Sequence, residues 1–148
     1  MFKKIVFLFA IFHFSCASNI KQNTTSKRVV VYESKPCYGR CEAFSLTLFE
    51  DKKMEYDGFK NTKKSGKFYA KITTVDFKKI KILINKLDYE NLKTDYTSKR
   101  TDLHLRILIL NSLEKQKTIF LRDEIPIDIL NLEKEINRLV KKYEFKKE

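Results

Sequence analysis

The sequence predicts an α+β domain in which an antiparallel sheet of about six strands carries two helices on one face. Strand-like runs of alternating or β-branched residues occur four times before residue 73 and twice between residues 103 and 121. Apolar residues at helical spacing follow each group, over residues 77–87 and 129–143. The expected order is ββββαββα, and strands and helices segregated in this way are typical of α+β folds.

The chain has room for one such domain. Its 148 residues are 43% hydrophobic and 13% aromatic, with 3 glycines and 2 prolines, which provides for one modest core without low-complexity sequence. We expect the folded domain to span residues 28–145.

The first four strands are expected over residues 29–32, 44–48, 53–57 and 67–72. Pro36 ends the first strand, because proline has no backbone donor for a ladder. A turn at residues 50–52 joins the second and third strands into a hairpin, and Gly58 is expected to break the third strand.

The first helix follows Thr73 or Thr74, either of which can cap it, and is expected to end between residues 88 and 91. In the next strand, apolar residues at 103, 105, 107 and 109 alternate with His104 and Arg106 before an apolar tail at 108 and 110, which predicts a central strand. A hairpin turn at residues 111–114 leads to the last strand, over residues 118–121.

Pro126 is expected as the first residue of the second helix. The apolar stripe of this helix consists of Ile129, Leu132, Ile136, Leu139 and Tyr143. Its opposite face mixes Glu133 and Glu135 with Lys134 and Arg138. This mixture favours a core-facing helix over a membrane-binding one, whose polar face would be uniformly basic.

The amino terminus has the features of a lipoprotein signal peptide over residues 1–15. Two lysines precede the apolar stretch 5–14, which is too short to cross a bilayer of about 30 Å. A small residue then stands directly before Cys16, as in the site that bacterial lipoprotein signal peptidase cleaves. His13 and Phe14 depart from that pattern, and the alternative is ordinary secretion with Cys16 in the discarded peptide.

Residues 16–27 are therefore expected to be a lipidated Cys16 and a polar, flexible tether. No acidic residue closely follows Cys16, so nothing resembles the signals that export some lipoproteins to the cell exterior. We expect a lipid-anchored protein of the cell envelope, at the outer membrane and facing the periplasm.

The net charge of +12 raises the question of an anionic partner. The positive residues are mostly lysines, scattered over every predicted element, and no basic stripe alternates with exposed aromatic residues. We therefore expect a solvated surface and no nucleic-acid partner, while weak attraction to anionic lipid headgroups stays open.

The segment Pro36-Cys37-Tyr38-Gly39-Arg40-Cys41 holds two of the three cysteines. Export to an oxidising compartment favours a disulfide between Cys37 and Cys41, and Gly39 is free to take positive φ between them. A bridge over so few residues contributes roughly 2 kcal/mol. The alternative is a thiol site for copper or disulfide exchange, with His104 as a third ligand.

The remaining residues carry no motif specific to hydrolysis, phosphate binding or metal binding. Asp102, after Thr101, is the one carboxylate that we expect to be buried, and the simplest interpretation is a side chain that binds nearby backbone. We expect no cofactor, and a non-catalytic protein rather than an enzyme.

Several motifs in fixed order resemble those of an uncharacterised bacterial domain of unknown function found in small exported proteins and lipoproteins. The cysteine segment precedes a strand at 44–48, and then come Tyr56-Asp57-Gly58, the turn at 64–68 and Thr101-Asp102-Leu103. Glu42 and His104 stand where that family has proline. The resemblance covers roughly residues 29–142 and implies no activity.

Together these observations predict a lipid-anchored envelope protein that binds a protein or another envelope component. The loop with Pro36, Tyr38, Gly39 and Arg40 is the expected contact surface.

Overall fold

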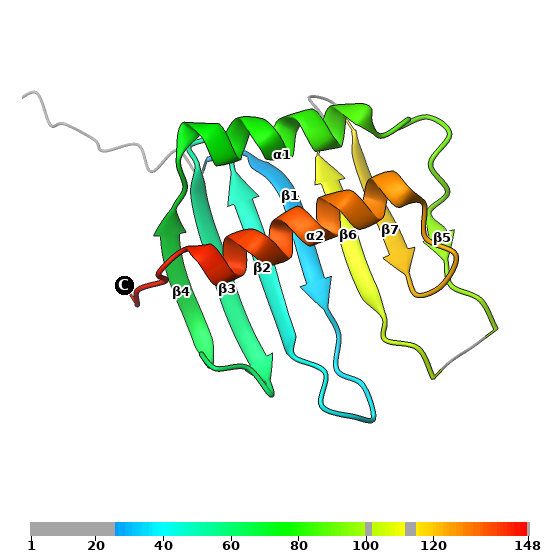
Figure 1. Ribbon diagram of the computed structural model, residues 1–148, viewed down its shortest axis with the longest axis horizontal. Coiled ribbons are helices and arrows are strands. Elements are labelled where there is room, and N and C mark those ends of the chain that lie inside the picture. Colours follow the sequence, from blue (N-terminus) through cyan, green and yellow to red (C-terminus); the bar gives the residue numbers. More distant parts are fainter. Residues whose placement is uncertain (1–25, 100–101, 112–114, 148) are drawn as a thin grey trace, which may run out of the picture.

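The computed structural model describes residues 26–99, 102–111 and 115–147. The expected signal peptide, Cys16 and most of the tether lie outside these residues, as does Thr101. In chain order the elements are β1 Arg28–Ser34, β2 Ala43–Phe49, β3 Lys53–Lys60, β4 Gly66–Lys71, α1 Thr74–Lys86, β5 Asp95–Tyr96, β6 Arg106–Asn111, β7 Gln116–Leu121 and α2 Ile127–Lys142 (Figure 1). None of the described helices is long and apolar enough to cross a membrane.

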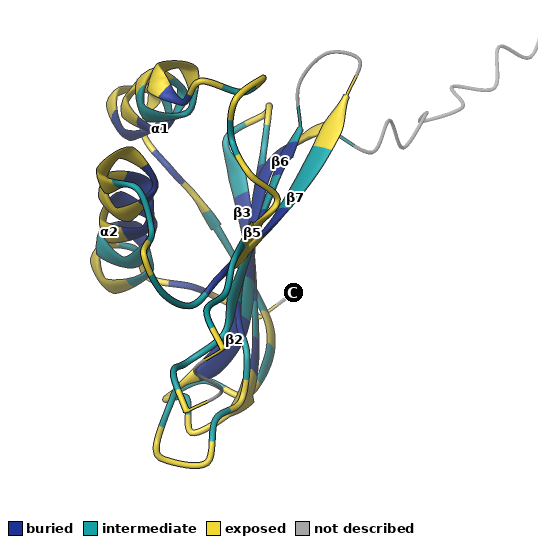
Figure 2. Cartoon of the chain, turned by 90° about the vertical axis from the view of Figure 1, so that its right-hand side faces the viewer, coloured by how far each residue is buried: buried dark blue, intermediate teal, exposed yellow. Residues whose placement is uncertain are grey.

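The strands form one sheet in the order β4-β3-β2-β1-β6-β7-β5, and α1 and α2 both cover the same face of it (Figure 2). The predicted α+β class with two helices on one face is confirmed. The sheet has seven strands and is mixed, however, because β5 pairs with β7 in parallel. A strand of two residues is too short to leave a periodic pattern in the sequence, which explains why the sequence predicted about six strands.

The register decides which side chains point toward the helices. Val30 lies opposite Leu48 and Leu110, and residues opposite one another share a face of the sheet. Leu110 and Leu108 are buried in the core, whereas Ile107 and Ile109 lie on the open face. β6 is central, as predicted, but it begins at Arg106, so that the alternation from residue 103 starts before the strand.

Local signals at the helix ends agree with the sequence to within a few residues. Thr73 caps α1, since its hydroxyl accepts a hydrogen bond from the Asp76 amide at 3.2 Å. α1 ends at Lys86, earlier than predicted, and Leu87 follows it into the core. Pro126 precedes the first helical residue of α2 instead of occupying it.

Glycine has a different role in β3 from the one predicted. Gly58 does not break the strand, which continues to Lys60. A Cβ atom at residue 58 would lie 1.9 Å from the carbonyl oxygen of Lys64, so glycine is required because the following turn folds back against the strand. In the β2–β3 turn, which has no glycine, Lys52 takes the left-handed conformation with φ of 70°.

Candidate functional site

The cysteine loop, residues 35–42, joins the two strands β1 and β2 at the lower end of the sheet (Figure 1). Cys37 and Cys41 form the predicted disulfide, with 5.7 Å between their Cα atoms. Gly39 does not take a positive φ, so the bridge closes without the glycine conformation expected from the sequence. The side chain of Tyr38 is fully exposed at the tip.

Polar groups hold the ends of the cysteine loop together. The Ser34 hydroxyl donates to the Glu42 carbonyl oxygen across the base of the loop. The Lys35 amide donates to the carbonyl oxygen of Leu105 at 3.1 Å, and the side-chain amide of Asn61 donates to the Cys41 carbonyl oxygen at 3.2 Å. The backbone on both sides of the disulfide is therefore fixed by neighbouring segments.

His104 also serves the backbone of the loop. Its Nε2 lies 2.7 Å from the carbonyl oxygen of Lys35 and 3.3 Å from the hydroxyl of Ser34. A carbonyl oxygen only accepts, so Nε2 carries the proton that this hydrogen bond needs. Ser34 and His104 thus do not form a nucleophile and base. The Nε2 atom of His104 is a donor, and the Ser34 hydroxyl donates its hydrogen bond to the backbone carbonyl oxygen of Glu42.

The sequence-predicted residues are brought together only in part. Cys41 and His104 line one surface hollow of about 400 Å³, and Cys37, Tyr38 and Asp102 line another of about 560 Å³. Asp102 is exposed, so the prediction of a buried carboxylate there was wrong. The described residues contain no group of three or more histidine, cysteine or acidic side chains placed to hold a metal ion.

A largely buried ion pair lines the first of these hollows. Arg106 of β6 donates from Nε to one oxygen of Glu133 at 2.8 Å and from Nη2 to the other at 3.3 Å, which ties α2 to the sheet. Burial, together with the charge of Glu133, raises the pKa of the neighbouring Tyr32. Tyr32 also begins a row of aromatic contacts with Phe44 and Tyr56.

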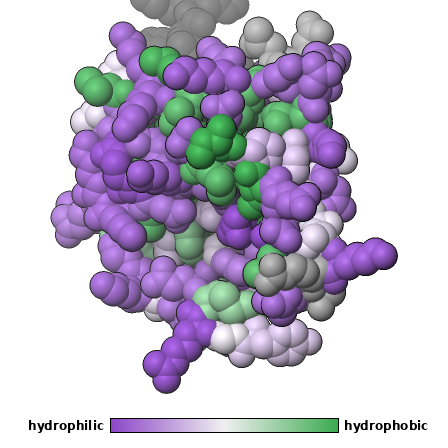
Figure 3. Space-filling view, turned by 45° about the vertical axis from the view of Figure 1, so that its right-hand side comes forward, coloured by the Kyte–Doolittle hydropathy of each residue, from purple (hydrophilic) through white to green (hydrophobic). Residues whose placement is uncertain are grey.

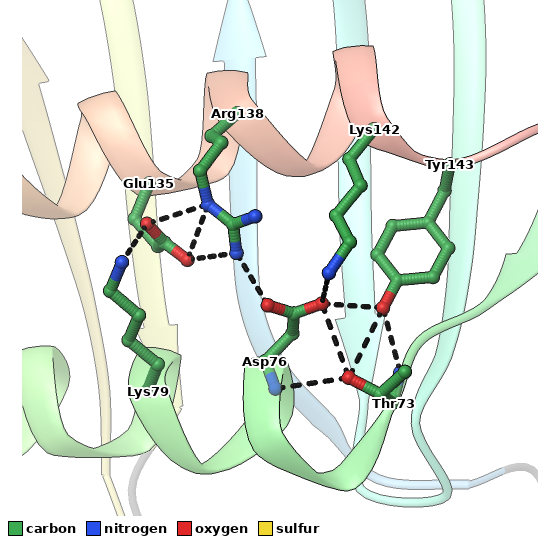
Figure 4. Close-up of polar contacts among 7 residues, drawn as sticks. All are labelled: Thr73, Asp76, Lys79, Glu135, Arg138, Lys142 and Tyr143. Atoms are coloured by element: carbon green, nitrogen blue, oxygen red, sulfur yellow. Dashed lines mark hydrogen bonds and ion pairs between the residues drawn. The ribbon is translucent and has the colours of Figure 1, made fainter.

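A second polar cluster joins the two helices (Figure 4). Asp76 of α1 accepts from Arg138 at 2.5 Å, from Lys142 at 2.6 Å and from the Tyr143 hydroxyl at 2.5 Å. These donors, with Lys142 first, hold the pKa of Asp76 well below its usual range. Every oxygen of this carboxylate is engaged by protein, so its arrangement is that of a structural link.

Glu135 extends the same cluster along α2. It accepts from Arg138 at 2.6 Å and pairs with Lys79 of α1 at 2.8 Å. Burial opposes ionisation of Glu135, but the hydrogen bonds from Arg138 and Lys79 outweigh it, and its pKa is lowered. Arg138 therefore bridges the two carboxylates Asp76 and Glu135.

The sequence prediction for the polar face of α2 was wrong. Glu133 and Glu135 are buried, with relative exposures of 6% and 5%, and do not share an open face with Lys134. Their spacing contained the signal: Glu133 lies one turn from Ile129 and Ile136, at the margin of the apolar stripe. Acidic residues at that margin reach cations from other elements.

The domain that carries both clusters matches a known family. Residues 28–140 match the family described as Domain of unknown function (DUF6438). The chain belongs to the DUF6438 family. The matched residues of this DUF6438 domain include the cysteine loop and nearly all of both helices. No curated protein matches the chain.

We predict that Asp76→Asn destabilises the DUF6438 domain by roughly 2 kcal/mol at neutral pH. Lys142 loses its counter-charge and Arg138 keeps only Glu135, while the partial exposure of both cations limits the loss. Because the pKa of Asp76 is lower in the folded protein, its ionised carboxylate stabilises the fold at pH values above the ordinary aspartate pKa. This stabilisation is lost as the pH falls toward the pKa of the folded state. The difference between wild type and variant should therefore shrink below about pH 4. Urea unfolding followed by circular dichroism measures both.

Asp128→Asn is the matched control, since Asp128 is an exposed acid in the first turn of α2. It should change the free energy of unfolding by less than about 1 kcal/mol. Equal effects of the two substitutions, or a difference that does not depend on pH, would contradict a structural role for the Asp76 cluster.

Proposed function

We propose that this DUF6438 protein is a lipid-anchored protein of the cell envelope without catalytic activity, whose cysteine loop contacts a protein partner. In this proposal Cys16 carries the lipid, the tether leads to β1, and the chain is held at the outer membrane facing the periplasm. The observation that carries it is the fully exposed Tyr38 on a disulfide-closed loop.

The polar groups near the loop support a binding role over a catalytic one. Ser34 and His104, the pair that most resembles a catalytic dyad, are both engaged in holding the loop backbone. Tyr38 and Arg40 are left exposed, and tyrosine and arginine are enriched among the residues that dominate protein–protein affinity. A loop fixed before binding loses little conformational entropy when a partner binds.

The position of the loop also suits this role. β1 starts at Arg28, next to the expected tether, and ends at Ser34, next to the cysteine loop (Figure 1). Seven residues of strand extend roughly 20 Å. A chain held at its amino terminus would therefore present the loop at the far end of the sheet.

The anchoring is tested by growing cells with a radioactive fatty acid. We expect the wild-type protein to carry the label and Cys16→Ala to lose it, because the thiol of Cys16 is the proposed site of acylation. A double variant, Cys37→Ser with Cys41→Ser, is the control and should keep the label. Equal labelling of the wild type and Cys16→Ala would rule out the anchor.

The contact is tested with a photoreactive amino acid in place of Tyr38, activated in intact cells. We expect a covalent adduct with one envelope protein, because the side chain at this position is fully exposed. The same amino acid at Phe120, an exposed aromatic residue on the open face of the sheet, is the matched control. Absence of an adduct at residue 38, or the same adduct at both positions, would contradict the proposal.

A further inference from the structure

The two helices have more basic than acidic residues, and most of their acidic residues are buried, so their outer surface is positively charged. α1 and α2 contain eight basic and four acidic residues. Three of the acids, Asp76, Glu133 and Glu135, are buried. Both helices are described throughout, and Asp128 is their one exposed acid. The outer face of α2 is therefore not the mixture of acidic and basic residues from which the sequence disfavoured membrane binding.

The outward residues form an outer helix surface, which consists of Val75, Lys78, Ile82 and Lys86 on α1 and Ile127, Lys134 and Lys141 on α2. These positions recur at helical spacing, opposite the buried stripes. Val75, Ile82 and Ile127 are 76%, 56% and 67% exposed. Figure 3 takes in part of this side, where hydrophilic side chains predominate around a small hydrophobic group.

Lysines that surround isolated aliphatic side chains suit the headgroup region of an anionic bilayer. The aliphatic groups can enter the boundary between headgroups and acyl chains, while the lysine stems extend along it and their ammonium groups meet phosphate. A protein partner or a nucleic acid would instead favour arginine and aromatic side chains. None of the residues that define the outer helix surface is arginine or aromatic.

The beginning of the described chain lies beside α1. The amide of Glu50 donates to the carbonyl oxygen of Lys27 at 2.9 Å, and the carboxylate of Glu50 pairs with Lys81 of α1 at 2.9 Å. Ten residue steps separate Cys16 from Ser26, the first described residue, so this segment can extend about 35 Å at most. A lipid on Cys16 would therefore keep the outer helix surface within reach of the membrane.

We propose that the outer helix surface binds the anionic phospholipid headgroups of the membrane that anchors Cys16. The inference rests on the proposed anchoring and adds an orientation to it. The helix layer faces the bilayer, and the open face of the sheet, with Ile107 and Ile109, faces away from it.

The test attaches an environment-sensitive fluorophore at Ile82→Cys. With Cys16 acylated and Cys37 bonded to Cys41, the new cysteine is the single free thiol of the mature protein. The labelled protein is reconstituted into vesicles of phosphatidylglycerol mixed with phosphatidylcholine, or of phosphatidylcholine alone, each with a lipid-borne quencher. We expect quenching at residue 82 that is several-fold stronger in the anionic vesicles, because the lysine ammonium groups of the outer helix surface are attracted to anionic headgroups.

A label at Phe120→Cys, an exposed residue on the open face, is the control for orientation and should stay unquenched. Replacing Lys78, Lys86, Lys134 and Lys141 by glutamine should reduce quenching at residue 82 to the value in phosphatidylcholine. The charge-matched control replaces four exposed lysines elsewhere, Lys60, Lys67, Lys99 and Lys115, and should leave quenching intact.

If both lysine sets reduce the quenching at residue 82 equally, the attraction is one of overall charge only. If quenching is stronger at residue 120 than at residue 82, the open face of the sheet faces the bilayer. Either result overturns the inference. Acylation of Cys16 is measured on the same sample. An acylated chain without quenching at residue 82 overturns the helix contact alone and would leave the surface to a soluble acidic partner. A chain without acylation overturns the anchoring on which the contact rests.

Discussion

Two helices on one face of a sheet must be held to each other as well as to the sheet, and here buried carboxylates make both connections. Asp76 and Glu135 meet between the helices and share Arg138, while Glu133 reaches down to Arg106 on β6. A buried carboxylate is costly unless cations and donors surround it. Each of these acids therefore requires partners from another element, and that requirement limits where α1 and α2 can lie.

The same arrangement determines the surface. Because the acids of the helices point inward and are neutralised there, the lysines that remain outside face solvent almost without acidic neighbours on the helices. At the end of the sheet that carries the cysteine loop, the polar groups of Ser34 and His104 likewise bind the backbone of the loop. What the molecule exposes is thus an aromatic loop tip and a basic helix layer, two surfaces of different chemistry.

Much of the fold follows from local patterns. Runs of alternating residues predicted the main strands. A threonine cap for α1 and a disulfide between Cys37 and Cys41 were also predicted, and the structure has both. The rest depends on distant residues. Two-residue β5 exists because β7 offers it an edge, and β6 is apolar on both faces, so periodicity could not tell Leu108 from Ile107. His104 serves the loop only because the β1–β6 pairing brings it there.

A double-mutant cycle measures how far Asp76 and Arg138 stabilise the fold through each other. Unfolding free energies at neutral pH are measured for the wild type, Asp76→Asn, Arg138→Gln and the double variant. We expect the double variant to be less destabilised than the sum of the single variants, with a coupling energy of roughly 1 to 2 kcal/mol. Additive effects, within about 0.3 kcal/mol, would contradict it.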